Sequence, residues 1–134
     1  MAERVVWTVE GGVADVRMNR PDKMNALDQA MFDGLVEAGE ALKKDKSIRA
    51  VVLSGEGRAF CAGLDFGSFQ AMAGGGADTP SKSAGTVAKA DPVGDVGDVQ
   101  HGRITHKGQQ AVYTWQELDV PVIAAVHGVA LGGG

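Results

Sequence analysis

The sequence predicts an α/β fold, in which helices cover a β-sheet. Three observations support this prediction: two β-rich segments separated by a glycine pair, a helical pattern that leads into an apolar β-branched segment, and a second helical pattern that does the same. The chain has 134 residues, 44% hydrophobic and 22% charged, which is the composition of a globular protein of ordinary domain size. We therefore treat residues 1–134 as part of one domain.

The first two predicted strands form a β-hairpin. Residues 4–10 and 13–18 are rich in β-branched residues, and Gly11 and Gly12 separate them. Glycine readily adopts the positive φ angles that a two-residue hairpin turn requires. We therefore expect two antiparallel strands joined by a tight turn.

An amphipathic helix is predicted next, with Asp28 as its N-cap. Apolar residues recur at helical spacing from Met31 to Leu42, and lysines gather near the expected negative C-terminal end of the helix. Residues 48–53 then form an apolar, β-branched run of the kind that is buried in a sheet on both faces. This order of hairpin, helix and strand is the basis of the α/β prediction.

The second half of the sequence predicts a loop, a helix and a strand. Residues 74–98 are rich in small and polar residues and lack aromatic residues, which predicts a mobile loop. From Ile104 to Leu118, apolar or small residues recur at helical spacing, which predicts a second helix that ends before Pro121. Residues 122–126 predict another buried strand.

The glycine triplet 132–134 follows this strand and ends the sequence. Such glycines suit a tight connection from a strand to a helix, but domain boundaries usually fall in exposed polar linkers. We therefore expect residues 1–134 to be the N-terminal part of a core domain whose C-terminal half is absent.

Composition argues against several classes of partner. Asp and Glu number 17 against 13 Lys and Arg, so no broad positive field is present to attract nucleic acid. The longest apolar run, residues 120–131, contains His127 and is shorter than the roughly 20 residues that cross a membrane. The single cysteine, Cys61, agrees with a reducing compartment, and without a targeting signal in the sequence we expect the cytoplasm.

Three segments, in this order, resemble the crotonase superfamily, which is the enoyl-CoA hydratase/isomerase family. They are Asn19-Arg20-Pro21 with Asn25-Ala26-Leu27-Asp28, then residues 58–65 (RAFCAGLD), then residues 121–134 (PVIAAVHGVALGGG). The resemblance implies the crotonase (ClpP-like) ββα spiral, of which only the first turns are present. It also implies a homotrimer or a dimer of trimers for the complete protein.

The resemblance also implies where the chemistry takes place. Reactions of this family pass through an enolate-like anion on the thioester oxygen, and the backbone N–H groups of Leu64 and Gly133 match the two donors that stabilise it. Leu64 precedes an expected short helix over residues 65–72, whose positive end would lie near its N–H group. The residues implied to bind substrate or CoA are Lys23, Met24, Ala26, Leu27, Arg58, Ala62, Gly63, Asp65, Phe66 and Gly132.

Several of these residues have a second interpretation. Arg58 suits a CoA phosphate and a solvated turn equally well, and Phe66-Gly67-Ser68 replaces the family's usual aliphatic residue and cation. Asp65 suits the N-cap of the next helix better than a catalytic base. Cys61 has no base near it in the sequence, so we expect buried packing rather than a nucleophile.

From their positions in the sequence, we expect the histidines to provide neither a catalytic group nor a metal site. His101 and His106 are five positions apart, which does not suit a zinc pair on a helix, so we expect solvated loop residues. His127 ends a predicted strand, where a hydrogen-bonded core histidine is expected.

The resemblance implies an enzyme of acyl-CoA and fatty acid metabolism that hydrates 2-enoyl-CoA, with lyase favoured over isomerase. Coenzyme A would be part of the substrate, and no permanently bound cofactor is expected. The glutamates that hydratases use match positions beyond Gly134. Three alternatives stay open: an enoyl-CoA isomerase or other reaction of the family, a thioester-binding protein without catalysis, and a structural α/β module that binds no CoA.

Overall fold

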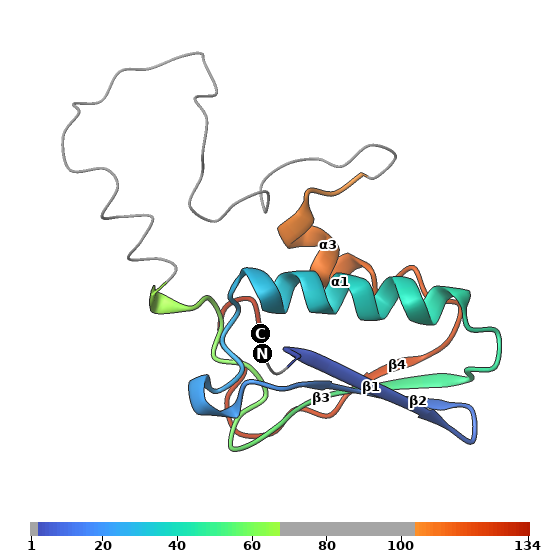
Figure 1. Ribbon diagram of the computed structural model, residues 1–134, viewed down its shortest axis with the longest axis horizontal. Coiled ribbons are helices and arrows are strands. Elements are labelled where there is room, and N and C mark those ends of the chain that lie inside the picture. Colours follow the sequence, from blue (N-terminus) through green and yellow to red (C-terminus); the bar gives the residue numbers. More distant parts are fainter. Residues whose placement is uncertain (1–2, 68–103) are drawn as a thin grey trace, which may run out of the picture.

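The structure is a computed structural model that describes residues 3–67 and 104–134. It contains one four-stranded sheet in the order β1-β2-β3-β4, with helices on one side (Figure 1). This mixture of sheet and covering helices confirms the predicted α/β class. The elements are β1 (Val5–Glu10), β2 (Val13–Met18), the 3-10 helix η1 (Pro21–Lys23), α1 (Gln29–Lys44), β3 (Ala50–Gly55), α3 (Lys107–Tyr113) and β4 (Val122–Ala124).

The predicted hairpin is confirmed. Strands β1 and β2 pair antiparallel, with Glu10 opposite Val13 across the turn. Gly11 and Gly12 have φ angles of 58° and 82°. Both residues therefore occupy the left-handed region, in which a two-residue turn matches the twist of the strands it joins.

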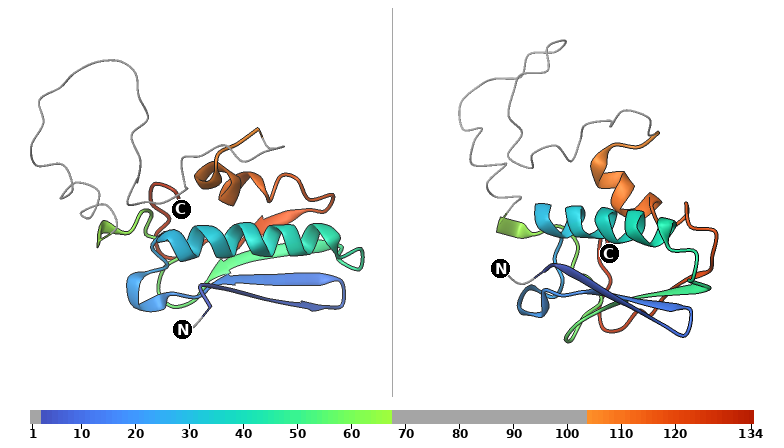
Figure 2. Two further views of the ribbon diagram at one scale, coloured as in Figure 1. Left: turned by 45° about the horizontal axis from the view of Figure 1, so that its top comes forward. Right: turned by 45° about the vertical axis from the view of Figure 1, so that its right-hand side comes forward.

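The helix α1 begins where the sequence predicts. The Asp28 side chain accepts a hydrogen bond of 2.9 Å from the Met31 N–H group, which is the geometry of an N-cap. α1 lies over one side of the sheet (Figure 2). Its buried apolar residues form the core together with buried residues of β1, β2 and β3. The buried residues of α1 are Met31, Phe32, Leu35, Ala38, Gly39 and Leu42.

The connection through α1 makes β3 parallel to β2, and β4 is in turn parallel to β3. The expectation that residues 48–53 are buried on both faces is wrong, because only Val51 of β3 is fully buried. In β2, buried residues alternate with more exposed ones, as expected where helices cover one face of a sheet. The described helices leave the opposite face of the sheet open.

The second predicted helix is shorter than expected. Thr114 still donates to the Gln110 carbonyl four residues back, but Gln116 donates to Tyr113, three residues back. The chain therefore tightens into turns after Tyr113, so α3 ends before Trp115 and Leu118, and Ile104 lies before its start. α3 packs against α1 on the helical side of the sheet (Figure 2).

The last strand is not buried as predicted. β4 spans three residues, and the Ile123 side chain is 56% exposed. β3 pairs with one edge of β4, and no described strand pairs with the other. The apolar composition of residues 122–126 therefore does not correspond to burial within the described residues.

The predicted loop 74–98, His101 and most of the predicted helix 65–72 lie outside the described residues. Within residues 3–67 and 104–134, no helix has the length and apolarity needed to span a membrane. The same residues contain no group of three or more His, Cys, Asp or Glu side chains that could hold a metal ion.

Candidate functional site

Leu64 and Gly133, far apart in the sequence, line the same open pocket. The pocket has a volume of about 610 Å³ and lies between the start of α1, the helix α3 and the end of the chain. It is lined by Leu27, Phe32, Leu64, Thr105, His106, Gly108, Gln109, Val112, Tyr113, Gln116 and Gly133.

A second hollow, of about 310 Å³, shares Leu64 and Gly133 with the first. Its other lining residues are Ala62, Gly63, Phe66 and Gly132, all of which the sequence predicts at the site. No Asp, Glu, Lys or Arg from the described part of the chain lines either pocket. The second hollow is therefore lined by backbone and uncharged apolar or small residues, whereas the first pocket also has polar side chains such as His106 and Tyr113.

The segment that contains Leu64 is attached to Leu27 on both sides. Leu27 N–H donates to the Gly63 carbonyl at 2.7 Å, and Asp65 N–H donates to the Leu27 carbonyl at 3.0 Å. The Leu64 N–H group between them donates to no described backbone carbonyl. Gly63 has a φ angle of 85°, and a Cβ atom there would lie 2.7 Å from the Leu131 carbonyl oxygen, so only glycine fits without displacement.

The glycine triplet is held beside Cys61. Cys61 N–H donates to the Val129 carbonyl at 3.1 Å, and Leu131 N–H donates to the Cys61 carbonyl at 3.0 Å. A Cβ atom on Gly133 would lie 2.7 Å from the Leu27 side chain. No backbone carbonyl of residues 3–67 or 104–134 accepts the Gly133 N–H group.

Asn25 organises the turn before α1, and sequence reasoning did not identify this role. Its side chain is fully buried, accepts from Arg20 N–H at 2.8 Å, and donates to the carbonyls of Glu56 and Ala59 at 2.9 Å each. Met24 and Asn25 have φ angles of 49° and 55°. Asparagine tolerates this left-handed conformation better than most residues, so the Asn-Ala-Leu-Asp segment contained a usable signal.

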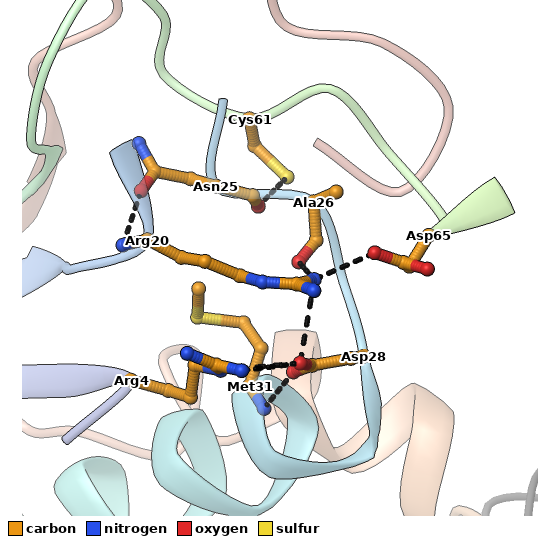
Figure 3. Close-up of polar contacts among 8 residues, drawn as sticks. All are labelled: Arg4, Arg20, Asn25, Ala26, Asp28, Met31, Cys61 and Asp65. Carbon is orange, nitrogen blue, oxygen red and sulfur yellow. Dashed lines mark hydrogen bonds and ion pairs between the residues drawn. The ribbon is translucent and has the colours of Figure 1, made fainter. Parts of the chain in front are cut away.

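Arg20 was also not proposed as a site residue. Together with Arg4, Asp28 and Asp65 it forms a group of ion pairs at the start of α1, which we call the Arg20 cluster (Figure 3). Arg20 Nη1 lies 2.7 Å from the Asp65 carboxylate and 3.3 Å from that of Asp28, and it donates to the Ala26 carbonyl at 3.1 Å. Asp65 therefore has an ion-pair partner, while the helix expected to follow it lies mainly outside the described residues.

Of the other predicted binding residues, some lie beside the second hollow and others lie at the surface. The Met24 carbonyl accepts from Ala62 N–H at 2.9 Å, which attaches the turn to the second hollow. Lys23 and Arg58 are exposed, and neither lines a described pocket. Their proposed contacts with CoA stay predictions.

Cys61 is buried, as expected, and its thiol donates to the Asn25 carbonyl at 3.2 Å. Burial raises the pKa of this thiol above its ordinary value, although a backbone N–H group from Gly63 acts in the opposite direction. The thiolate that a nucleophile requires is therefore disfavoured, which agrees with a packing role.

The histidines differ from expectation. His127 is exposed rather than part of the core, because no described element covers the end of β4, although its Nε2 atom lies 2.9 Å from the Gly57 carbonyl oxygen. His106, expected to be solvated, is the N-cap residue of α3 and lines the larger pocket. Its Nδ1 atom is buried and has no hydrogen-bond partner among the described residues.

The fold and the pockets define an α/β protein whose candidate site lies between α1, α3 and the glycine-rich end of the chain. The chain matches the sequence model of the enoyl-CoA hydratase/isomerase family over residues 8–90, and it belongs to that family. The crotonase assignment made from the sequence is therefore confirmed.

Individual relatives agree with this assignment. The chain is 31% identical over its whole length to 1,2-epoxyphenylacetyl-CoA isomerase of Escherichia coli (strain K12), of which it covers 44%. It is 33% identical over 96% of its length to the mitochondrial Delta(3,5)-Delta(2,4)-dienoyl-CoA isomerase of Mus musculus, of which it covers 36%. The chain thus spans about two fifths of the length of these relatives.

A solved structure confirms the fold. An enoyl-CoA hydratase/carnithine racemase from Magnetospirillum magneticum superimposes with a TM-score of 0.71 at 32% identity. The match covers 99% of this chain and 42% of that protein. The described sheet and helices are therefore the corresponding part of a crotonase fold.

Proposed function

We propose that the protein stabilises the enolate oxygen of an acyl-CoA thioester with the backbone N–H groups of Leu64 and Gly133. The observation that carries this proposal is that both residues line one pocket and that neither N–H group donates to a described backbone carbonyl. Two N–H groups that donate to no backbone carbonyl of the described residues are suited to a developing negative charge. The apolar lining around them, which includes Leu27, Phe32 and Val112, suits an acyl chain.

The proposed reaction is hydration of 2-enoyl-CoA, which makes the enzyme a lyase. Isomerisation is the second candidate, because two of the relatives are named as isomerases of CoA thioesters. Either reaction needs an acid or base to move protons, and no described carboxylate lines the pockets. We propose that residues beyond Gly134 supply that group and that CoA enters only as part of the substrate.

Assembly and location are also proposals. A homotrimer or a dimer of trimers is proposed for the complete protein. The cytoplasm is proposed as its location because the one cysteine is a free thiol, whereas the names of two relatives place them in mitochondria and peroxisomes. Imaging a fluorescent fusion of the full-length protein tests the location.

Activity assays with the full-length protein test the reaction. Crotonyl-CoA should lose its enoyl absorbance if the protein is a hydratase, while a 3-enoyl-CoA should gain it if the protein is an isomerase. Absence of both reactions together with measurable thioester binding would favour the thioester-binding alternative. Absence of binding as well, over several acyl chain lengths, would favour the structural module.

A matched pair of glycine variants tests the site. Gly132→Ala and Gly11→Ala each place alanine at a φ angle near 50° to 58° with no atom within 4 Å of the added Cβ. Each should lower stability by about 1 kcal/mol, because both positions are left-handed. Only Gly132→Ala should also lower kcat/KM, by about tenfold or more, since Gly132 lines the hollow and precedes the Gly133 donor. Equal activity in the two variants would contradict the proposed site.

A further inference from the structure

We propose that Arg20 is a positioning residue for the oxyanion site: it holds Asp65 and thereby orients the neighbouring Leu64 N–H group. This inference rests on the proposed function, and it assigns a role in that function to a side chain outside both pockets.

The contacts of Arg20 join three parts of the site. Its Nη1 atom lies 2.7 Å from the Asp65 carboxylate, 3.3 Å from the Asp28 carboxylate and 3.1 Å from the Ala26 carbonyl (Figure 3). The side chain of Arg20 is 12% exposed and that of Asp65 is 14% exposed. Because the pair is largely removed from water, solvent screens it less than an ion pair at the surface.

The Leu64 segment, residues 63–66, needs such an attachment because packing holds it weakly. The side chain of Leu64 is 52% exposed, and that of Phe66 is 82% exposed. The preceding residue, Gly63, has no side chain that could restrict the peptide, and its φ angle of 85° is one that glycine adopts readily. Contacts of the backbone and of Asp65 must therefore hold the segment in place.

Backbone bonds attach the Leu64 segment to the turn before α1, and Arg20 adds an attachment through a side chain. Gly63 and Asp65 both bond to Leu27, and the preceding Ala62 bonds to Met24. The ion pair of Asp65 with Arg20 adds a side-chain attachment from the residue that precedes η1. An oxyanion donor must be held within a fraction of an ångström, so losing this attachment should affect turnover more than substrate binding.

Arg4 provides a matched control. It pairs with the same Asp28 carboxylate, at 3.0 Å, but its side chain is 29% exposed, whereas that of Arg20 is 12% exposed. Arg4→Gln removes an ion pair from the Arg20 cluster without removing the attachment of the Leu64 segment. If the cluster only stabilises the fold, neither Arg4→Gln nor Arg20→Gln should change the activity of the protein that stays folded.

The experiment compares full-length wild type, Arg20→Gln, Asp65→Asn, Arg4→Gln and the double variant Arg20→Gln/Asp65→Asn. Hexanoyl-CoA labelled with carbon-13 at the thioester carbonyl is the probe, because the infrared frequency of a bound carbonyl reports hydrogen bonds to its oxygen. Its dissociation constant is measured in parallel, as are kcat and KM for the enoyl-CoA that the wild type converts. All proteins are compared at a temperature where each is folded by circular dichroism.

In Arg20→Gln and Asp65→Asn, we expect the carbonyl frequency to move towards that of free hexanoyl-CoA and kcat to fall about tenfold or more, with binding nearly unchanged. For the carbonyl frequency and kcat, the double variant should be no worse than the more damaging single variant, because both substitutions break the Arg20–Asp65 ion pair. Arg4→Gln should keep the wild-type frequency and kcat. Asp65→Asn preserves the size of the side chain, so it tests the positioning role by itself if Arg20→Gln does not fold.

Two results would overturn the inference, and they are distinguishable. If the wild type shifts the carbonyl frequency and the Arg20 and Asp65 variants shift it equally, the positioning role is wrong while the proposed oxyanion site stands. If the wild type binds hexanoyl-CoA without shifting its carbonyl, the oxyanion site itself fails and the positioning role fails with it.

Discussion

At the scale of single residues, Asn25 explains how the turn before α1 keeps an unfavourable backbone conformation. The side chain makes three hydrogen bonds, one with the backbone of Arg20 and two with backbone carbonyls that follow β3, and it is fully buried. These bonds offset the cost of left-handed φ angles at Met24 and Asn25. This turn also places Leu27 against the Leu64 segment.

Asn25→Ala should therefore destabilise the protein strongly. The substitution leaves one backbone N–H group and two carbonyls without their partner, and we expect a loss of about 3 kcal/mol or more in the free energy of unfolding. Urea unfolding followed by circular dichroism measures this loss. Asn19→Ala is the control, because Asn19 makes one exposed hydrogen bond of 3.3 Å and its loss should cost about 0.5 kcal/mol or less. Equal losses in the two variants would contradict the central role of Asn25.

At the scale of elements, the open face of the sheet is partly polar rather than fully apolar. Asp15 and Arg17 are neighbours on one face of β2, and their side chains bond to each other. Arg17 also bonds to Glu56, which follows β3, at 2.9 Å. These ion pairs let part of the sheet face water, as occurs in sheets covered on one side.

This ion pair predicts a pH dependence of stability. The hydrogen bond from Arg17 lowers the pKa of Asp15, although burial acts in the opposite direction. The folded state therefore binds this proton less readily than the unfolded state, whose aspartate pKa is about 3.9. The stabilisation is present above that pH and is lost as the pH falls through the lowered pKa of the folded state.

Asp15→Asn should therefore show a smaller loss of stability than the wild type between neutral and acidic pH. Arg17→Gln should reduce the dependence similarly, because it removes the main cause of the lowered pKa. Urea midpoints measured from pH 6 down to about pH 3 test both variants. An unchanged acid dependence in both would show that the pair does not contribute to stability.

At the scale of the whole molecule, β4 and the segment that follows it leave apolar side chains uncovered. Ile123, Val126, Val129 and Leu131 are exposed, and the free edge of β4 has no partner among the described strands. An exposed apolar strand edge is a site of association between chains. The 134-residue chain should therefore self-associate through this edge.

Ile123→Lys should reduce that association, because it places a charge on the free edge. Val13→Lys is the control: Val13 is 42% exposed, but it lies in β2, which has partners on both sides. Sedimentation velocity over a range of chain concentrations measures the effect. If Val13→Lys reduces association as much as Ile123→Lys, net charge rather than the edge of β4 controls it.

The sequence by itself determined the hairpin, the start of α1 and the class of fold. Glycines with positive φ, the Asp28 cap and apolar spacing act within a few residues, so they can be recognised without tertiary contacts. The family motifs also placed Leu64 and Gly133 at one candidate site, where the structure puts both in the lining of the same pocket.

Only the tertiary structure decided the Arg20 cluster, the burial of Asn25, the early end of α3 and the exposure of β4. Arg20 and Asp65 are distant in the sequence, and Asn25 bonds to carbonyls that follow β3, so no local pattern predicts those contacts. An apolar run such as residues 122–126 indicates that burial is favourable, but burial needs a second element to cover it. These features depend on which segments lie side by side, and that is a property of the folded chain.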